Sequence, residues 1–315
     1  MAGYGLPNEQ HLYVVLEEDL KKSGQNIKVV NGSVSGSTSS AGLNRAEWTL
    51  SEPGIDLIVL GLGANDMLRG IKPSETEKNL EKIILTAKEK NMIVMNTPGG
   101  NSNATAEHAF ALIMSVLRKI PFANETTHKG QWEKKNIKGT ELSKKTLGIV
   151  GFGNVGVQLS YLVKGFNMEI LVSSKSLESR KKDYPHVKNV SFDELISKSD
   201  IISFHCKAAK DGKSLITKEH YKKMKSTAVI INTARGNIVD ENDLNEALNK
   251  NLIAGAAVDV FSKEPAKENI LFNNPKAILT PHIAASTTEA SIVVAEMVAN
   301  QISDFLLNGV KKNTV

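Results

Sequence analysis

Three residues that could move a proton or bind an anion each follow an apolar run in the second half of the chain. The run "AVIIN" leads through "TAR" to Arg235, "IAGAAVDVF" leads to Glu264, and "AILTP" leads to His282. His282 could accept a hydroxyl proton, because the ordinary pKa of histidine lies near neutrality. Glu264 could fix the tautomer of that imidazole, and Arg235 could bind a carboxylate through two charge-assisted hydrogen bonds. Each residue taken alone could instead form a surface ion pair or lie unused in a loop.

A glycine-rich segment precedes these residues in the chain. "LGIVGFGNVG" places Gly151, Gly153 and Gly156 directly after an apolar run and directly before the helix-periodic stretch "VQLSYLVKGF". Gly151 permits a tight turn, Gly153 removes a side chain where backbone would approach a phosphate, and Gly156 allows close packing of the helix. The amides and the dipole of the helix would then hold the anion. The segment therefore predicts a dinucleotide-binding turn, with a plain turn as the alternative.

The strand ends and the glycine turn can meet at one edge of a sheet. In open parallel sheets, ligands bind outside the carboxyl ends of the strands, where Arg235, Asp259, Glu264 and His282 are expected. When a nicotinamide accepts a hydride, the protein has to supply a proton acceptor, an anchor for the substrate and an orienting group. The pattern therefore predicts hydride transfer at a small 2-hydroxy acid, with NAD as the cofactor.

The strand after the glycine turn, "MEILVSS", leaves the choice of nucleotide open. An acidic residue at its end would accept the ribose 2′-hydroxyl of NAD, but Ser174 stands there, with Lys175 beside it and Arg180 nearby. The missing carboxylate makes NADP possible. Lys175 and Arg180 could equally belong to an ordinary surface loop.

Short apolar runs alternate with amphipathic stretches along the chain, which predicts βα units and a parallel sheet. "IKVVN" and "IDLIVLG" are expected to be strands, and "ETEKNLEKIILTAKEKN" a helix. Another helix is expected from Asn103, capped by Asn103 or Thr105 and stopped by Pro121. The predicted fold is α/β: a Rossmann-type doubly wound parallel sheet with a second, smaller flavodoxin-like α/β lobe.

Composition narrows the class of protein. The chain has 315 residues and a formal charge of +5, but its lysines are interleaved with acidic residues, so we expect no nucleic-acid partner. No apolar run approaches membrane-spanning length, and the start "MAGYGLP" lacks the pattern of a signal segment. The single cysteine, Cys206, cannot form an internal disulfide. We expect a cytoplasmic globular protein without membrane partners, and the sequence predicts no metal site.

From about residue 92 onward the chain resembles the D-2-hydroxyacid dehydrogenase family, most of all its phosphoglycerate dehydrogenases. The matching segments are "VMNTPGGNSNATAEH", "LGIVGFGNVG", "INTARGNIVDE", "AAVDVFSKEP" and "LTPHIAAST". The resemblance implies that Arg235, Glu264 and His282 are catalytic and that the substrate is a 2-hydroxy or 2-oxo acid similar to 3-phosphoglycerate. It also implies a homodimer built around the helix near Asn103. The cofactor-binding residues that it implies are Gly151, Gly153, Asn154, Val155, Gly156, Ser174, Cys206, Thr233, Ala234, Asp259 and Ala285.

The first 92 or so residues resemble a different family, the SGNH (GDSL-type) esterases, through "AGYGLP", "VVNGSVSGSTSSAGLNR" and "GLGANDMLRG". The resemblance implies Gly36 and Asn65 as oxyanion donors. The nucleophilic serine would precede "AGYGLP" and is not in the chain, and the Asp183 to His186 spacing is expected to be a coincidence. This region is therefore interpreted as a scaffold, and the chain as a fusion.

We accordingly predict three segments: residues 1–96 as an N-terminal α/β lobe in the place of a substrate domain, 97–284 as the dinucleotide-binding domain, and 285–315 as a helix returning to the N-terminal lobe. Two alternatives to the dehydrogenase remain. One is a protein that binds nucleotide but turns over weakly, because the usual substrate-lobe motifs are missing. The other is an SGNH-type esterase.

Overall fold

The computed structural model describes residues 12–55, 57–63, 65–66, 69–209 and 211–314. The chain divides into two compact units. The larger unit comprises Gly99–Val294, and the smaller one comprises Met1–Pro98 together with Ala295–Val315. Each unit is described by itself below.

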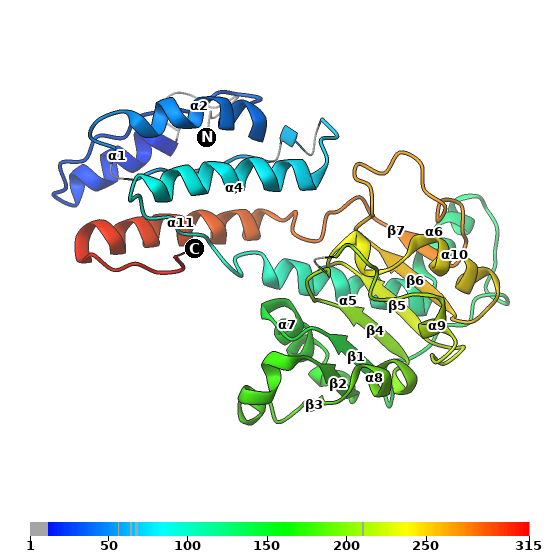
Figure 1. Cartoon of the computed structure of the whole chain (residues 1–315). Coiled ribbons are helices and arrows are strands. Elements are labelled where there is room, and N and C mark those ends of the chain that lie inside the picture. The colour runs from blue at the N-terminus through cyan, green and yellow to red at the C-terminus, as the bar shows by residue number, and fades with distance from the viewer. Residues whose placement is uncertain (1–11, 56, 64, 67–68, 210, 315) are drawn as a thin grey trace. The chain divides into compact units, whose positions relative to one another are not determined.

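The larger unit alternates strands and helices along the chain, as Figure 1 shows. Its strands are β1 (Thr146–Val150), β2 (Glu169–Ser173), β3 (Lys188–Asn189), β4 (Ile201–Phe204), β5 (Val229–Asn232), β6 (Gly255–Val258) and β7 (Ala277–Leu279). Its α-helices are α5 (Ser102–Arg118), α6 (Ile120–His128), α7 (Asn154–Leu162), α8 (Phe192–Lys198), α9 (Lys218–Tyr221) and α10 (Glu241–Asn249). Short 3₁₀ turns are η2 (Lys164–Phe166), η3 (Lys175–Asp183) and η4 (Gly236–Ile238).

Within the described residues, seven strands form one sheet in the order β3-β2-β1-β4-β5-β6-β7. Every neighbouring pair is parallel. The order runs outward in both directions from β1 and β4, which places a topological switch point beside the end of β1. The predicted Rossmann-type doubly wound sheet is confirmed.

Alternate residues of the strands face different helices, because successive side chains of a strand point to opposite faces. In β5, Val229 and Ile231 belong to a buried cluster that also contains α5 and α7 residues such as Ala109 and Leu159. Ile230, between them, belongs to a second cluster that contains Leu195 of α8 and residues of α9 and α10. Both faces are covered by helices, which explains why the strands read as continuous apolar runs rather than as alternating ones.

The helix expected from Asn103 begins at Ser102, but the expectations about its cap and its end are both wrong. Asn103 and Thr105 do not cap it: Asn103 Nδ2 donates to Glu107 Oε1 (2.7 Å), and Thr105 Oγ1 donates to the Asn101 carbonyl (3.0 Å). Pro121 does not end it either, since Lys119 takes a left-handed conformation (φ 52°) and α6 starts with Pro121 in its first turn. Proline lacks only an amide that would have no partner there, so it starts a helix as readily as it stops one.

The smaller unit contains α1 (Leu12–Lys22), α2 (Ser39–Ser51), α4 (Pro73–Glu89) and most of α11 (Thr288–Asn308). The helix predicted from "ETEKNLEKIILTAKEKN" is confirmed as α4. Ala46, Leu50, Ile83 and Ala87 of α2 and α4 form its buried core. The Thr38 side chain caps α2 by accepting a hydrogen bond from the Ala41 amide (3.2 Å).

The two strands predicted in this unit are not formed. "IKVVN" and the described part of "IDLIVLG" are not strands, and the one bridge among the described residues of this unit joins Met95 to Thr314. Val30, Val59 and Leu60 of these runs are exposed. A parallel strand is stable when helices bury both of its faces, and these runs do not reach that burial. The apolar pattern was sufficient to predict extended backbone, but not a flavodoxin-like sheet.

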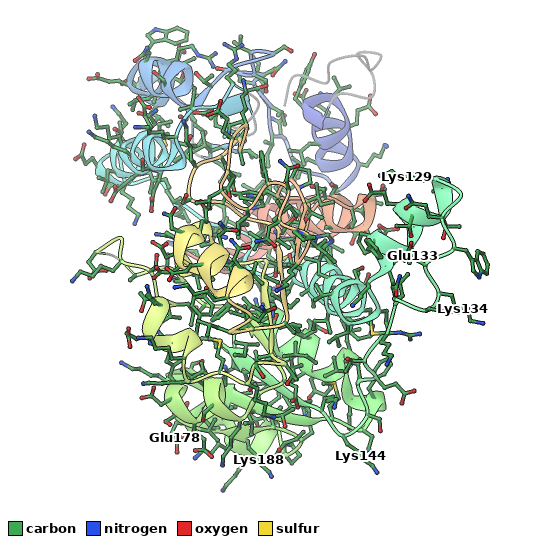
Figure 2. The ribbon with its side chains drawn as sticks, turned by 90° about the vertical axis from the view of Figure 1, so that its right-hand side faces the viewer. Lys129, Glu133, Lys134, Lys144, Glu178 and Lys188 are labelled. Atoms are coloured by element: carbon green, nitrogen blue, oxygen red, sulfur yellow. The ribbon has the colours of Figure 1, made fainter. Side chains whose placement is uncertain are left out.

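The surface of the larger unit carries basic and acidic side chains side by side. Figure 2 labels examples that point outward, including Lys129, Glu178 and Lys188. Lys188 Nζ pairs with Glu169 (2.8 Å) and Lys181 Nζ with Glu178 (2.5 Å). In these parts of the described surface, each of these basic side chains therefore lies next to an acidic one.

α11 has 21 residues and is the one helix in the described part of the chain that is long and apolar enough to cross a membrane. The expectation that no apolar run approaches membrane-spanning length is therefore wrong for α11. Length and composition alone are weak evidence, since core helices of globular proteins can share both. Ala290 and Ile302 of α11 are buried, but only 17% of its apolar stretch is buried within the described structure.

Candidate active site

The candidate residues follow the carboxyl ends of three adjacent strands of the larger unit. Arg235 lies two residues beyond Thr233 in the segment after β5, Asp259 directly follows β6, and His282 follows β7. β5, β6 and β7 are parallel neighbours, so their carboxyl ends lie at one edge of the sheet. The sheet therefore brings together residues that are distant in the sequence.

His282 and Glu264 form the central pair of this edge. Their Nδ1 and Oε2 atoms are 2.7 Å apart, and the other carboxylate oxygen of Glu264 accepts a hydrogen bond from the Phe261 amide (2.8 Å). The hydrogen bond to Glu264 raises the pKa of His282 above its ordinary 6.5. Burial raises the pKa of Glu264, but its hydrogen bonds with His282 and Phe261 outweigh burial, and the net shift is downward. The carboxylate therefore stays ionised and stabilises a protonated His282.

Arg235 is held by its backbone while its guanidinium remains exposed. Asn232 Nδ2 donates to the Arg235 carbonyl (2.9 Å), and Arg235 Nη1 donates to the Ala234 carbonyl (2.6 Å). The charge of Arg235 lowers the pKa of His282, but the hydrogen bond to Glu264 outweighs it. A Cβ on Gly236 would lie 2.0 Å from the Phe261 carbonyl carbon, so glycine is needed for this close approach.

Asp259 fixes the backbone that carries His282. It is fully buried and accepts hydrogen bonds from the Ile283 and Ala284 amides (both 3.0 Å) and from Thr280 Oγ1 (2.5 Å). The His282 amide donates to the Asp259 carbonyl (2.8 Å), and His282 takes a left-handed conformation with φ of 55°. Such a conformation costs about 1–3 kcal/mol in a residue with a side chain, so these bonds hold it in place.

His108 of α5 contacts the same carboxylate and was not predicted. Its Nε2 lies 3.4 Å from Asp259 Oδ1 and 3.3 Å from Thr280 Oγ1. The sequence held one signal: a polar residue between the apolar positions Ala106 and Ala109 of a helix that packs on the sheet. The partner of that histidine could not be read from helical spacing, because it lies on a distant strand end.

The glycine turn has the geometry that a dinucleotide needs. Gly151 has φ of 92°, and a Cβ there would lie 2.7 Å from the His205 carbonyl oxygen. A Cβ on Gly156 would lie 2.5 Å from the Gly151 carbonyl oxygen, so the helix packs tightly on the turn. A Cβ on Gly153 would meet nothing within 4 Å, because this position faces open space where a phosphate could approach. Asn154 and Val155 begin α7, whose first amides have no partner within the helix.

The other predicted cofactor residues lie at the same edge of the sheet. Thr233 is buried, and its Oγ1 has no hydrogen-bond partner in the described structure, as expected for an atom that would bond to a ligand. Its neighbour Ala234 donates its amide to Asn232 Oδ1 (3.2 Å). Cys206 follows β4 and lies against Gly151; burial raises the pKa of its thiol. Ala285 lies in the loop between β7 and α11. These observations fit a bound nicotinamide dinucleotide.

The residues suggested by the esterase resemblance do not form a hydrolytic site. Asn65 Nδ2 donates to the Ser37 carbonyl (3.0 Å), and the Gly36 carbonyl accepts from Arg69 Nη2 (2.9 Å). Asp66 is buried and accepts from the Ser39 amide (2.7 Å) and the Ser39 hydroxyl. These bonds join the turn to the start of α2, which is a scaffold role. The segment "AGYGLP" lies outside the described residues.

The Asp183 to His186 spacing gives no catalytic base. His186 Nε2 lies 3.0 Å from Ser160 Oγ, and that hydroxyl donates to the Val157 carbonyl (2.7 Å). The hydroxyl must then accept from His186, so the ring nitrogen that faces it carries a proton. Ser160 is also fully buried. Among the described residues, no group of three or more His, Cys, Asp or Glu side chains is placed to hold a metal ion.

Comparison with known families places two matches along the chain. Residues 110–284 match the D-isomer specific 2-hydroxyacid dehydrogenase family, NAD binding domain, and residues 1–123 match the GDSL-like lipase/acylhydrolase family. The first match covers more than half of the chain and contains every residue of the edge described above, apart from His108 and Ala285. Both resemblances expected from the sequence are confirmed.

Individual relatives agree on the family but not on the substrate. D-3-phosphoglycerate dehydrogenase of Archaeoglobus fulgidus is 40% identical over 70% of this chain and 42% of its own length. Glyoxylate reductase of Thermococcus litoralis is 38% identical over 73% of this chain and 71% of its own length. The chain thus spans about two fifths of the length of the phosphoglycerate dehydrogenases that it matches.

Two solved structures are also similar to this chain, and they too carry the names of different enzymes. A glyoxylate reductase from Paecilomyes thermophila has 32% identity and a TM-score of 0.65, over 74% of this chain and 70% of its own. An acyclic imino acid reductase in complex with NADPH and D-Arg has 25% identity and a TM-score of 0.74, over 97% of both chains.

Proposed function

Since the chain belongs to the D-2-hydroxyacid dehydrogenase family, we propose that it transfers a hydride between a small D-2-hydroxy acid and the nicotinamide of NAD or NADP. The observation that supports this most is the His282–Glu264 pair, 2.7 Å apart, at the carboxyl ends of parallel strands, with Arg235 following the neighbouring strand β5. A proton acceptor, its orienting carboxylate and an anion anchor are the groups that this reaction requires of a protein.

The roles follow from the positions of the side chains. Nε2 of His282, the nitrogen away from Glu264, would accept the hydroxyl proton of the substrate. A bound nicotinamide would supply the acceptor for the hydride of the carbon that bears this hydroxyl. Glu264 holds the ring in the tautomer that leaves Nε2 able to accept, and its charge stabilises the imidazolium that results. Arg235 binds the substrate carboxylate and polarises the developing carbonyl. In the reverse direction protonated His282 gives its proton to the 2-oxo group.

The cofactor is proposed to lie along the edge from β2 to β7. Gly151, Gly153 and Gly156 admit the pyrophosphate, and the amides of Asn154 and Val155 bind it. Ser174 and Cys206 would lie on the adenosine side. Thr233, Ala234, Asp259 and Ala285 would lie on the nicotinamide side, where the partnerless hydroxyl of Thr233 can bond.

A 3-phosphoglycerate-like acid is the proposed substrate, because phosphoglycerate dehydrogenases are among the most similar relatives. The similarity of the glyoxylate reductases favours smaller 2-oxo acids as a second candidate. Residues 1–96, which lie within the match to the other family, would stand in the place of a substrate domain along the chain. We further propose a cytoplasmic homodimer, for which the exposed Ile120 and Phe122 after α5 provide an apolar surface.

In the experiment, the purified chain is first titrated with NADH and NADPH, and fluorescence reports binding. Reduction of the oxidised nucleotide is then assayed with the D and L forms of 3-phosphoglycerate, glycerate and lactate. Saturable reduction of the nucleotide by a D-acid, with little reduction by its L-form, is expected. Nucleotide binding without turnover of any acid would favour the alternative, a binding protein whose N-terminal unit does not complete the site. Absence of nucleotide binding would refute the proposal.

A further inference from the structure

The segment that follows β2 differs from the pattern that selects NAD. In dinucleotide-binding folds the residue at this strand end contacts the ribose 2′-oxygen, and an acid there accepts the hydrogen of a 2′-hydroxyl. Ser174 stands at this position, at the end of β2 and the start of η3. Residues 174–183 carry four basic side chains against two acidic ones: Lys175, Arg180, Lys181 and Lys182, with Glu178 and Asp183.

Arg180 is held against the glycine turn by its own hydrogen bonds. Its Nη2 donates to the Phe152 carbonyl (2.9 Å), inside the turn, and its Nε donates to the Ser176 carbonyl (3.1 Å). The guanidinium also lies over the ring of Tyr184, 5.7 Å from its centroid, and Phe152 packs edge-on against the same ring. The side chain is half-buried. A long side chain fixed in this way loses little further entropy when it binds an anion.

The remaining donors of this cluster point to a phosphate. The bonds described for Arg180 use Nε and Nη2, so no described contact uses Nη1. Ser174 Oγ and Ser176 Oγ lie 3.0 Å apart in a mutual hydrogen bond, so one of the two hydroxyls keeps its hydrogen free to donate; Ser176 Oγ also accepts from Arg180 Nη2 (3.3 Å). Glu178, the nearest acid in sequence to Arg180, is engaged by Lys181 (2.5 Å) and Asn189 (2.9 Å).

From these contacts we infer that Ser174, Ser176 and Arg180 form a site for the 2′-phosphate of adenosine, so that the protein selects NADP(H) over NAD(H). The inference rests on the proposed function, because it requires a dinucleotide at the glycine turn. It goes beyond that function in choosing one nucleotide and naming the residues that choose it. Lys175 adds to the field of the site, since it is exposed beside Ser174.

The first test is a comparison of NADPH and NADH affinity by titration of nicotinamide fluorescence on the full chain. NADPH is expected to bind about 10- to 100-fold more tightly, the effect of one or two charge-assisted hydrogen bonds. Tighter or equal binding of NADH would overturn the inference and leave the proposed function standing. Binding of neither nucleotide would refute the proposed function itself.

Variants assign the effect to residues. Arg180→Ala should weaken NADPH by about tenfold or more and leave NADH within about twofold, because the two nucleotides differ only in the 2′-phosphate. Ser174→Asp should reverse the preference by repelling the phosphate and accepting the 2′-hydroxyl of NADH. Lys181→Ala is the matched control: it removes the same charge from the same segment, but its Nζ is engaged by Glu178.

Two outcomes of this series would overturn the assignment. An equal loss of NADPH affinity in Lys181→Ala would show that only the general charge of the segment matters. An equal loss of NADH and NADPH affinity in Arg180→Ala would show that Arg180 supports the turn through the Phe152 carbonyl and does not read the phosphate. A probe without nicotinamide gives an independent check: 2′,5′-ADP should displace NADPH more effectively than 3′,5′-ADP, which has the same charge.

Discussion

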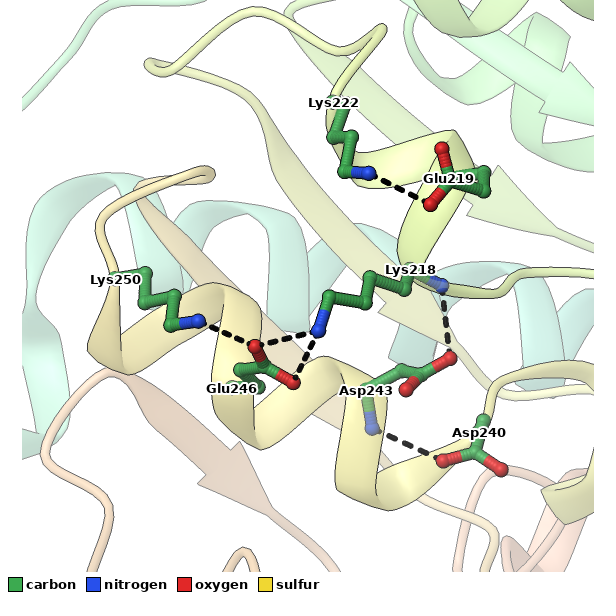
Figure 3. Close-up of polar contacts among 7 residues, drawn as sticks. All are labelled: Lys218, Glu219, Lys222, Asp240, Asp243, Glu246 and Lys250. Carbon is green, nitrogen blue, oxygen red and sulfur yellow. Dashed lines mark hydrogen bonds and ion pairs between the residues drawn. The ribbon is translucent and has the colours of Figure 1, made fainter.

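Glu264 and Glu246 both accept hydrogen bonds from basic side chains, yet they lie in different environments. Glu246, on the exposed side of α10, binds Lys250 (2.5 Å) and Lys218 (2.9 and 3.2 Å), as Figure 3 shows. These hydrogen bonds lower its pKa to about 2. Glu264 has one histidine and one amide as partners, and its side chain is only 15% exposed. The exposed carboxylate has the larger pKa shift, but water screens its interactions and no reacting group lies beside it.

A perturbed pKa alone therefore does not identify a site. The cluster around Glu246 also includes Asp240, which caps α10 by accepting from the Asp243 amide (3.0 Å), and Lys218, whose amide donates to Asp243 (2.8 Å). These bonds join α9 to α10 on the surface. The Glu264 pair instead lies at the carboxyl ends of parallel strands, where the fold presents a ligand-binding edge. Removing each pair should therefore have very different effects.

The largest effect is expected for His282→Ala. Loss of the proton acceptor should lower kcat by about 10²- to 10⁴-fold, with nucleotide affinity within about twofold of the original, because the ring does not support the glycine turn. Steady-state kinetics with a D-2-hydroxy acid and a fluorescence titration of the cofactor measure the two quantities. Parallel loss of turnover and cofactor affinity would argue for a structural role.

Glu264→Gln should have the next largest effect. The amide keeps the size of the side chain but removes the charge that stabilises the imidazolium, so kcat should fall by at least about tenfold, and by less than in His282→Ala. The measurement is kcat at saturating acid, with Glu246→Gln as the matched control. If both substitutions left kcat unchanged, the buried carboxylate of Glu264 would be no more important for turnover than the exposed one of Glu246.

Gly153→Ala should act on cofactor binding alone. Its φ of −85° suits any residue, and its Cβ would project into open space at the turn, so the free energy of unfolding should change little while nucleotide affinity falls about tenfold or more. Gly156→Ala is the contrasting variant, because its Cβ would lie 2.5 Å from a carbonyl oxygen. It should destabilise the protein by about 1–3 kcal/mol, measured by urea unfolding. Unchanged affinity in Gly153→Ala would place the pyrophosphate elsewhere.

Glu246→Gln should have the smallest effect. Exposed ion pairs contribute little, so kcat, KM and cofactor affinity should all stay at their original values. The same assays used for His282 check this expectation. A clear loss of turnover would mean that the network around α9 and α10 acts on the site. This outcome would contradict the expected difference between Glu246 and Glu264.

Much of the larger unit could be predicted from sequence, because its signals are local. The runs that became β1, β4, β5 and β6 are short and apolar, and Gly151 and Gly153 mark the turn directly. The convergence of Arg235, Glu264 and His282 followed from one rule about parallel strand ends. That rule needs only the order of the elements, not the details of packing.

The parts that could not be predicted depend on contacts between distant residues. His108 contacts Asp259 and Thr280, which are distant from it in the sequence, and helical periodicity alone does not predict such partners. The extended runs of the smaller unit have strand-like composition, but pairing requires neighbours that the pattern does not specify. Pro121 satisfies the rule for ending one helix and for starting another, and the left-handed backbone of Lys119 decides between them.

The pH dependence of kcat/KM in both directions tests the role of His282 most directly. Oxidation needs neutral His282 and should rise with pH through its raised pKa, whereas reduction needs the protonated ring and should fall with pH through the same value. In Glu264→Gln the inflection should move to lower pH, because the hydrogen bond to Glu264 is what raises the pKa. Two profiles that rise together, or an inflection that does not move in Glu264→Gln, would contradict the assignment of His282 as the proton acceptor.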